Sequence, residues 1–421
     1  MTPLHLAEAD HPDWDAFLAS HAGFAVEQTR SWADVQATRG WTSARLAGTR
    51  DGELVGGIQC LIRNVRGLLK VGYVVRGPFR HRDRGDGLRA YTAALRSLAR
   101  RHRLAYLAVV PAYFDEPERK PFEREGFFEG ADPFPPRSPM TATLVVDLSP
   151  PLEGILAAMR ATTRKHIRAG TRRGLVCRDG TAADLPGFAR LLVALCERRG
   201  AKPNIPVGDF LNHLWDRFHP AGTLKLLVVE YGQEPVCAEI LFRLGDWCRA
   251  WRIGWSGAHA DKYPNELIYW ESLRWAREQG CRHFDFFGFN TELARQILAG
   301  SPPTYEEAGR LCSMSNFKLG FGGTLLPPAP RYCYLPNRVA AWLARCAAPA
   351  ALRSTFVRRW LSATPARANF PLPRTEGSGQ SSGVKSAPPR PIPAAQAPAP
   401  EAPSRTHPVE AGTRTRRTSP D

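Results

Sequence analysis

A lysine followed by a cluster of glycines is the segment of this chain best suited to chemistry. It reads Ser315-Asn316-Phe317-Lys318-Leu319-Gly320-Phe321-Gly322-Gly323. Because glycine adopts positive φ and lets backbone approach a ligand closely, this composition predicts a tight turn. A lysine ammonium held beside such a turn can stabilise the negative charge that develops on a reacting oxygen. We therefore take Lys318 as the first candidate catalytic residue, against the alternative of an exposed lysine beside an ordinary turn.

An arginine stripe is the second candidate. Its members recur at i, i+4, which keeps them on one face of a predicted helix: Arg160, Arg164, Arg168 and Arg172. Lys165 borders the stripe, and no acidic residue occurs between Glu153 and Asp179. Like charges at this spacing repel, so the stripe favours an anionic ligand, and tRNA backbone or a nucleotide pyrophosphate both fit. The alternative is a solvated basic face.

Asp285 stands in a nearly all-aromatic predicted strand, His283-Phe284-Asp285-Phe286-Phe287. A carboxylate buried there needs a partner such as an arginine or backbone amides. It could act as a general base, but a structural ion pair is the stronger interpretation.

Aromatic residues mark the element before this strand. Trp247, Trp251 and Trp255 recur at every fourth position, so in a strand they share one face, which could stack a base but is more often core. Asn265 and Tyr269 lie at the start of the long helix that follows. Asn265 could cap this helix, and the helix N-terminus could hold an anion.

Composition narrows the class of protein. The chain has 421 residues, enough for two or three domains, and a formal net charge of +17, which favours an anionic partner. Its nine cysteines form no CxxC pair and indicate free thiols in a reducing compartment. Histidine spacing predicts no metal site, and no Walker or Rossmann motif predicts a bound cofactor. The N-terminus does not resemble a signal peptide and no run is apolar enough to span a membrane, so we expect a cytoplasmic protein, with contact to the inner membrane face left open.

Two halves of the chain repeat one order of elements. The first half predicts strand, turn, strand, strand, helix and strand, at residues 43–50, 51–52, 53–63, 68–75, 87–102 and 104–110. The second half predicts the same order at residues 224–231, 232–233, 235–244, 248–255, 265–280 and 283–287. Each series is preceded by helical segments. The repeat predicts an α/β fold of two tandem domains like the GNAT N-acyltransferases, with mixed, largely antiparallel sheets.

Domain limits follow from this repeat. We expect a first domain at residues 1–148, a second at 149–330 and a helical C-terminal cap at 331–363. Residues 364–421 are rich in Pro, Ala, Ser and Arg and are predicted to be disordered, because they have few side chains that could form a core.

The chain resembles the Fem family of aminoacyl and peptidyl transferases, which are built from two GNAT-like domains. Four segments carry the resemblance: Gln28–Trp32 with Gly40-Trp41; Thr163–Arg168 with Arg172-Arg173-Gly174; Pro264–Leu267 with Trp270-Glu271, Ala276, Gly280 and Phe284–Gly288; and Asn316–Lys318 with Phe321-Gly322. The resemblance implies transfer of an aminoacyl group from tRNA to an amine of a peptidoglycan precursor. It implies Lys318 in the chemistry, the arginine stripe and Lys165 on the donor phosphates, and an acceptor cleft lined by Trp32, Gln36, Trp255, Asn265, Tyr269 and Phe317.

The sequence departs from the family pattern where the acceptor should bind. Gln36 stands where the family often has lysine, Val110 stands where an acid often precedes the proline at Pro111, and Lys165-His166 replaces Tyr-Asn. Two other functions therefore stay open. One is an acyl-CoA-dependent N-acyltransferase, although the nearest phosphate-loop string, from Phe317 to Gly322, lacks the leading Arg or Gln. The other is a non-catalytic RNA- or surface-binding protein.

Overall fold

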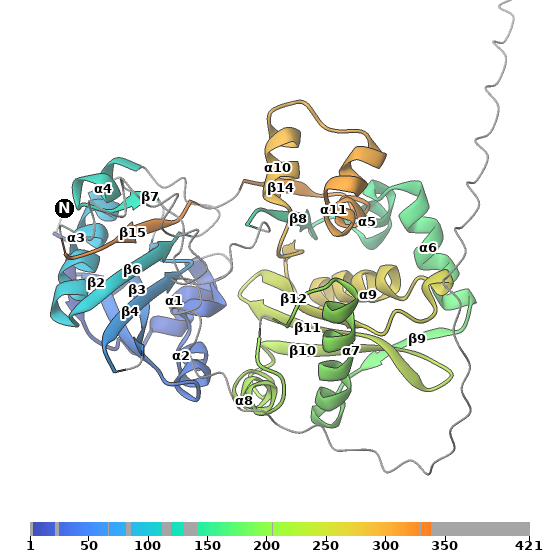
Figure 1. Cartoon of the computed structure of the whole chain (residues 1–421), viewed down its shortest axis with the longest axis horizontal. Helices are drawn as coiled ribbons and strands as arrows, with labels where there is room; N and C mark the ends of the chain where they lie inside the picture. The colour runs from blue at the N-terminus through green and yellow to red at the C-terminus, as the bar shows by residue number, and fades with distance from the viewer. Residues whose placement is uncertain are drawn as a thin grey trace, which may run out of the picture. The chain divides into compact units, whose positions relative to one another are not determined.

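The computed structural model describes residues 3–337 except 22–24, 66, 81–85, 112–118, 130–140, 204 and 328–329. Two mixed β-sheets with helices packed on them form the described chain, which confirms the predicted α/β fold with two GNAT-like domains (Figure 1). The predicted disordered tail, residues 364–421, lies outside the described residues, as does nearly all of the predicted cap.

The first sheet has the strand order β1-β2-β3-β4-β6-β15-β7, and β5 pairs with β3. Its strands are β1 His5–Glu8, β2 Trp41–Arg50, β3 Glu53–Val65, β4 Leu69–Val75, β5 Phe79–Arg80, β6 Leu104–Val110, β7 Phe128–Glu129 and β15 Tyr332–Tyr334. Its helices are α1 Trp14–His21, α2 Arg30–Ala37, α3 Asp86–Arg101 and α4 Arg119–Arg124, with a short 3-10 turn η1 at Val26–Gln28. Only β4 and β6 run parallel to each other.

The second sheet has the order β14-β8-β13-β12-β11-β10-β9. Its strands are β8 Thr143–Asp147, β9 Leu175–Asp179, β10 Leu224–Tyr231, β11 Glu234–Leu244, β12 Trp247–Trp255, β13 His283–Asp285 and β14 Thr324–Leu326. Its helices are α5 Leu152–Ala158, α6 Ala161–Arg172, α7 Leu185–Arg198, α8 Asp209–Phe218, α9 Pro264–Glu278, α10 Thr291–Leu298 and α11 Tyr305–Leu319, with 3-10 turns η2 Ala182–Asp184 and η3 Ala260–Lys262. Here β12 and β13 are the parallel pair.

The internal repeat is confirmed by matching hairpins. Asp51 and Gly52 join β2 to β3, and Gly232 and Gln233 join β10 to β11; all four residues have positive φ. A two-residue loop with both residues in this region is the turn whose twist suits a β-hairpin. Each hairpin also has a register irregularity a few residues before its turn, so the two halves share fine detail as well as element order.

The chain crosses between the sheets at two places that the sequence did not reveal. Strand β8 lies within the predicted first domain, residues 1–148, but it pairs with β13 and β14 of the second sheet. Strand β15 falls at the start of the predicted helical cap, yet it pairs with β6 and β7 of the first sheet. Both strands are short and owe their position to partners far away in the sequence, which local patterns do not predict.

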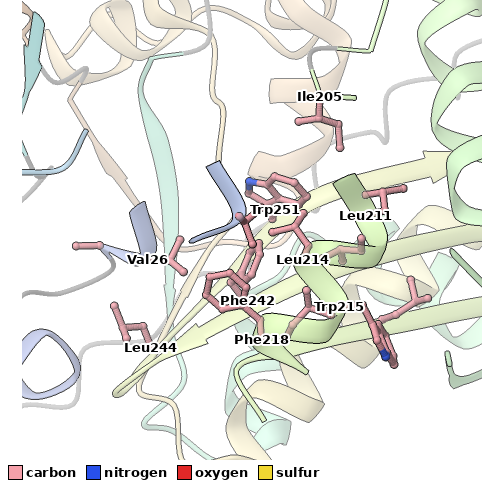
Figure 2. Packing of buried hydrophobic residues seen from close by; sticks show 14 of the residues in the cluster. Val26, Ile205, Leu211, Leu214, Trp215, Phe218, Phe242, Leu244 and Trp251 are labelled. Carbon is pink, nitrogen blue, oxygen red and sulfur yellow. The ribbon is translucent and has the colours of Figure 1, made fainter. Parts of the chain in front are cut away.

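Helices cover both faces of the second sheet. Helix α7 packs with residues such as Leu226 and Ile240, whereas α9 packs with Leu227 and Leu241, as the alternation of a strand requires (Figure 1). The cluster on the α7 side also includes Val26 of the first domain, and Figure 2 shows the aromatic and aliphatic side chains of this cluster together. The two domains therefore share one buried apolar cluster.

Candidate active site

The second sheet opens between its parallel strands. Strands β12 and β13 pair only from Trp247↔His283 to Arg249↔Asp285, and β12 then continues to Trp255 without β13 beside it. At the same point the register of β11 and β12 shifts, leaving Trp251 as an extra residue, which is a β-bulge. The corresponding strands of the first sheet, β4 and β6, stay paired over six residue pairs up to Val75↔Val110. Only the second of the two parallel pairs is split.

The bulge corrects the prediction for the three tryptophans. Trp247 and Trp251 are buried in the cluster on the α7 side, which confirms the core interpretation. Trp255 instead packs with the cluster on the α9 side. An extra residue reverses the alternation of side chains, so Trp255 lies on the opposite face from Trp251.

Lys318 lies at this split, but in a different setting from the one predicted. It belongs to the last turn of helix α11, not to a loop, and its side chain is only 3% exposed. Its Nζ donates to three consecutive carbonyl oxygens, those of Phe286 at 2.9 Å, Phe287 at 2.6 Å and Gly288 at 2.8 Å. An ammonium has three protons, so these three bonds use all of them. Burial lowers the pKa of Lys318 to about 8, and this effect is partly offset by Asp285 and, when it is ionised, by Glu239.

The glycines after Lys318 serve backbone packing. Gly322 and Gly323 have φ of 75° and 99°, as predicted for a turn. A Cβ on Gly323 would lie 2.5 Å from the Val145 carbonyl oxygen, and one on Gly320 would lie 2.4 Å from Thr163 Oγ1. The close approach expected of a ligand is thus made by strand β8 and helix α6.

Asp285 forms a structural ion pair. Its Oδ2 accepts from Arg249 Nε at 2.7 Å, and its Oδ1 accepts from the Phe287 amide at 2.8 Å and from the Thr143 hydroxyl. Burial alone would raise its pKa, but Arg249 and Arg76 hold the pKa of this carboxyl below its usual value. A carboxylate that is ionised and so fully bonded is poorly placed to accept a proton from substrate.

The first domain extends this ion pair. Glu27 Oε1 accepts from Arg249 Nη1 at 3.2 Å and lies 3.4 Å from Arg76 Nε. The residues Glu27, Arg76 and Arg249 are all buried. The ring of Phe287 has guanidinium groups over it at 5.0–5.8 Å from its centroid, contributed by Arg76, Arg249 and Arg252. Both domains thus hold the segment that follows β13.

The arginine stripe divides into two parts. Arg160 donates to the Asn316 side chain at 3.1 Å, and Arg164 donates to the carbonyls of Ala157 and Met159. Lys165, Arg168 and Arg172 are exposed on α6. Arg160 also lines a cavity of about 340 Å³, together with Leu293, Ile297, Pro302, Pro303, Tyr305, Ala308, Asn316 and Leu319. The exposed part of the stripe therefore remains the candidate for phosphate contact.

The residues expected in an acceptor cleft do not form one group. Gln36 is buried and accepts from Arg39, and Trp32 contacts Phe242 and Trp251 edge-on. Both belong to α2 of the first domain.

Three of the second-domain residues expected in that cleft lie on the α9 side of the split. Tyr269 contacts Phe317, with ring centroids 5.8 Å apart, and Trp255 packs in the same cluster. Asn265 does not cap α9, because Tyr263 is the N-cap residue and Pro264 the first residue of the helix; its side chain instead accepts from Cys237.

Sequence reasoning missed several charged groups near the split. Arg198 donates to the Trp255 carbonyl at 2.7 Å and lies over its ring, and the following Arg199 contacts Met314 Sδ. Their position at the end of an amphipathic helix could have indicated them. Glu239 lies in the middle of β11, and burial raises its pKa to about 8 although Ser272 donates to it at 2.7 Å. Its carboxyl is therefore protonated at neutral pH.

Two further observations concern membrane-spanning helices and disulfide bonds. Among the described residues, no helix combines the length and apolar character that crossing a bilayer requires. The described cysteines are all free thiols, as their spacing predicted.

Known proteins match both halves of the chain. Residues 10–120 match the model of the FemAB family, and residues 157–294 match that of the acetyltransferase (GNAT) domain. Lipid II:glycine glycyltransferase of Staphylococcus aureus is 23% identical over 251 residues, which cover 57% of this chain and 58% of that protein. The chain thus aligns with little more than half the length of this curated relative.

Solved structures extend the similarity of fold. A crystal structure of FemX has a TM-score of 0.67 at 18% identity and covers 80% of this chain and 99% of its own. A conserved protein of unknown function from Bacteroides thetaiotaomicron has a TM-score of 0.50 at 11% identity and covers 79% and 99%. Repeated sheets with a split, bulged strand pair define a tandem protein of the GNAT acyltransferase fold. In its sequence the chain is similar to the FemAB family over residues 10–120 and to the GNAT domain over residues 157–294.

Proposed function

We propose that this protein transfers an aminoacyl group from aminoacyl-tRNA to an amine of a lipid-linked peptidoglycan precursor. The observation that carries the proposal is the split between β12 and β13, with a bulge at Trp251, which is present in the second domain and absent between β4 and β6. The name of the Staphylococcus aureus relative makes glycyl transfer to lipid II a precedent for this reaction. The protein would act in the cytoplasm, at the inner face of the membrane where such an acceptor is held.

The reaction proposed for the split is aminolysis of an ester. The neutral amine of the acceptor attacks the ester carbonyl, and a C–N bond forms as the carbonyl electrons move onto oxygen. When this oxyanion collapses, the C–O bond to the tRNA ribose breaks, and the ribose oxygen takes up the proton that the amine loses. The protein's main task is to orient the two substrates and stabilise the oxyanion.

The exposed face of α6 suits the donor. Lys165, Arg168 and Arg172 are exposed, and no carboxylate occurs on α6 to neutralise them. Cations at this spacing match a phosphate backbone, and such contacts add affinity that falls with salt concentration. The +17 net charge of the chain adds long-range attraction for the same polyanion.

Acyl-CoA is the second candidate donor, favoured by the GNAT match at residues 157–294. In this fold a phosphate loop would lie between β12 and α9. Here that segment is Ser256–Tyr263, which contains one glycine. Two of its non-glycine residues, His259 and Tyr263, have positive φ. A run of free backbone amides at that place would favour coenzyme A. In the described structure the amides of His259, Ala260 and Asp261 make no hydrogen bond, so this loop is compatible with coenzyme A as well as with tRNA.

A single-turnover assay with matched tryptophan variants tests the proposal. Purified full-length protein is mixed with radiolabelled aminoacyl-tRNA or acyl-CoA and a lipid-linked precursor, and label in the lipid is counted. Trp255 on the split strand and Trp41 in the first sheet are both half-buried under an arginine, at 4.8 Å and 5.5 Å. Trp255→Ala should raise the KM for aminoacyl-tRNA about tenfold, and Trp41→Ala should leave it unchanged.

Three outcomes would contradict the proposal. Transfer only from acyl-CoA would establish the second candidate. An equal effect of the two tryptophan variants on donor KM would remove the split as the donor site. No transfer from either donor to any amine tested would refute the enzymatic function.

A further inference from the structure

The segment after β13 is a turn whose backbone is held at every residue. Phe287 and Gly288 have φ of 43° and 72°, two consecutive residues in the left-handed region. Left-handed backbone at Phe287 is costly, so it persists only where surrounding contacts enforce it. Here Lys318 donates hydrogen bonds to the carbonyls of Phe286, Phe287 and Gly288, and Asp285 accepts one from the Phe287 amide.

Lys318 has no proton left for a substrate in this arrangement. Three carbonyls converge on its Nζ within 2.9 Å, and an ammonium has three donors. The group is also buried, with 3% exposure. To reach a substrate oxygen directly, the lysine would have to abandon at least one buried carbonyl, which is unfavourable.

The turn leaves one backbone donor free near the end of the split. The peptide that joins Phe287 to Gly288 points its carbonyl at Lys318, and because a trans peptide is planar its N–H points the opposite way. Within the described chain, the Gly288 N–H makes no hydrogen bond, whereas the neighbouring amides of Phe287 and Phe289 donate to Asp285 and Ala142. Gly288 is half-buried and follows the last β12–β13 residue pair by three residues.

We propose that Lys318 is a positioning residue that holds the Phe286–Gly288 turn, and that the Gly288 N–H is the group that stabilises the oxyanion. This inference rests on the proposed aminoacyl transfer, since the oxyanion is that of its tetrahedral intermediate. Lys318 contributes to the rate through the turn. A preorganised backbone amide is a well-suited oxyanion donor, because it needs no reorganisation when charge develops.

Two neutral replacements separate positioning from direct charge stabilisation. Lys318→Gln keeps two N–H donors for the carbonyls but has no charge, whereas Lys318→Met has neither. If the lysine positions the turn, Lys318→Gln should retain at least tenfold more transfer activity than Lys318→Met. If the ammonium itself meets the oxyanion, both variants should lose the same 10²–10³-fold in rate.

Fluorine NMR follows the turn without any substrate. A 4-fluorophenylalanine placed at Phe287 reports the ring that lies under Arg76, Arg249 and Arg252. Its resonance should move in Lys318→Met, move less in Lys318→Gln and stay unchanged in Lys225→Met. Lys225 is a fair control because it pairs with Asp179 at the far side of the same sheet. An unmoved resonance in a folded, inactive Lys318→Met protein would overturn the positioning role.

Removal of the Gly288 N–H tests the second half of the proposal, that this N–H stabilises the oxyanion. Glycolate in place of Gly288 turns the amide into an ester, which deletes the N–H and also weakens the Phe287 carbonyl as an acceptor for Lys318, so the fluorine resonance at Phe287 serves as the control for the turn. The rate should fall by 10²–10³-fold with an unchanged KM for donor. An unchanged rate would exclude Gly288. If wild-type protein transfers nothing from aminoacyl-tRNA, the proposed function fails, while the fluorine measurement still decides whether Lys318 holds the turn.

Discussion

Replacement of Asp285 by asparagine should cost far more stability than a single hydrogen bond. The carboxylate accepts from Arg249, the Phe287 amide and the Thr143 hydroxyl, and it is 1% exposed. An asparagine amide has one oxygen and one NH2 group, so whichever way it is turned its NH2 meets either Arg249 Nε or the Phe287 amide, both donors. The guanidinium of Arg249 would then lose its ion pair with residue 285 and keep the one with Glu27.

The expected loss is about 3–5 kcal/mol of unfolding free energy, the usual cost of removing one partner of a buried ion pair. With an unfolding entropy of about 2.1 cal/mol/K per residue, each kcal/mol corresponds to roughly 1.5 °C for a body of about 320 residues, so the melting temperature should fall by about 4–8 °C. Calorimetry and urea unfolding on the full-length protein measure both quantities. Asp179→Asn is the matched control, because the Asp179 side chain is 73% exposed in its pair with Lys225, and it should cost at most about 1 kcal/mol.

The pH dependence supplies a second check on Asp285. Its pKa in the folded protein lies below the unfolded value, so its contribution is fully present above the unfolded pKa and is lost as the pH falls through the folded pKa. The difference in stability between wild type and Asp285→Asn should therefore be constant from pH 6 to 8 and shrink on acidification. A loss under 1 kcal/mol at pH 7, or a difference that does not shrink in acid, would refute the account of Asp285 as an ionised clamp.

Three further predictions follow from other sites. Burial raises the pKa of Glu239 to about 8, so its contribution to stability is present below the unfolded pKa and is lost as the pH rises to about 8. In urea titrations between pH 5 and 8, Glu239→Gln should therefore remove several kcal/mol of pH-dependent destabilisation. An unchanged pH profile would show that Glu239 is ionised. Gly323→Ala should cost at least about 3 kcal/mol of unfolding free energy. Gly52→Ala is the control: Gly52 also has positive φ, but no atom lies within 4 Å of the new Cβ, so this variant should cost about 1 kcal/mol. Equal melting temperatures of the two variants would contradict the contact geometry. Arg168→Ala and Arg172→Ala should each lower the log–log salt slope of tRNA binding by up to about 0.9, with the exposed Arg100→Ala as control, and unchanged slopes would assign the face of α6 to solvent.

Sequence patterns predicted the repeated elements because each has a strong local period. The hairpins around Asp51-Gly52 and Gly232-Gln233, the long helices and the parallel strands all lie where composition and alternation placed them. The bulge at Trp251 was not predictable, since it adds one residue inside a strand whose tryptophans are evenly spaced and shows only in the register with β11. That single residue moved Trp255 to the other face of the sheet.

For Asp285 the sequence predicted the structural ion pair that the structure has, whereas for Lys318 it predicted a group that meets a substrate oxygen. Lys318 and Asp285 were chosen because a lone lysine beside glycines and a lone acid among aromatics are unusual. Side-chain patterns could not indicate which arginine pairs with Asp285, nor that three backbone carbonyls accept from Lys318. The charged residues missed, Arg198 and Glu239, lie in elements that were read only for their apolar positions.

The divergence of the two halves indicates how the duplication has been used. In the first sheet, β4 and β6 remain paired over their length, so that sheet has no opening between parallel strands. In the second sheet the equivalent strands separate after Arg249↔Asp285, at the pair that Glu27 of the first domain reaches through Arg249. A separation of strands exposes backbone and is unfavourable unless the separated segment is held elsewhere. The first domain, Lys318 and Asp285 together hold that segment, so the unsplit copy serves as the support that allows the split copy to stay open.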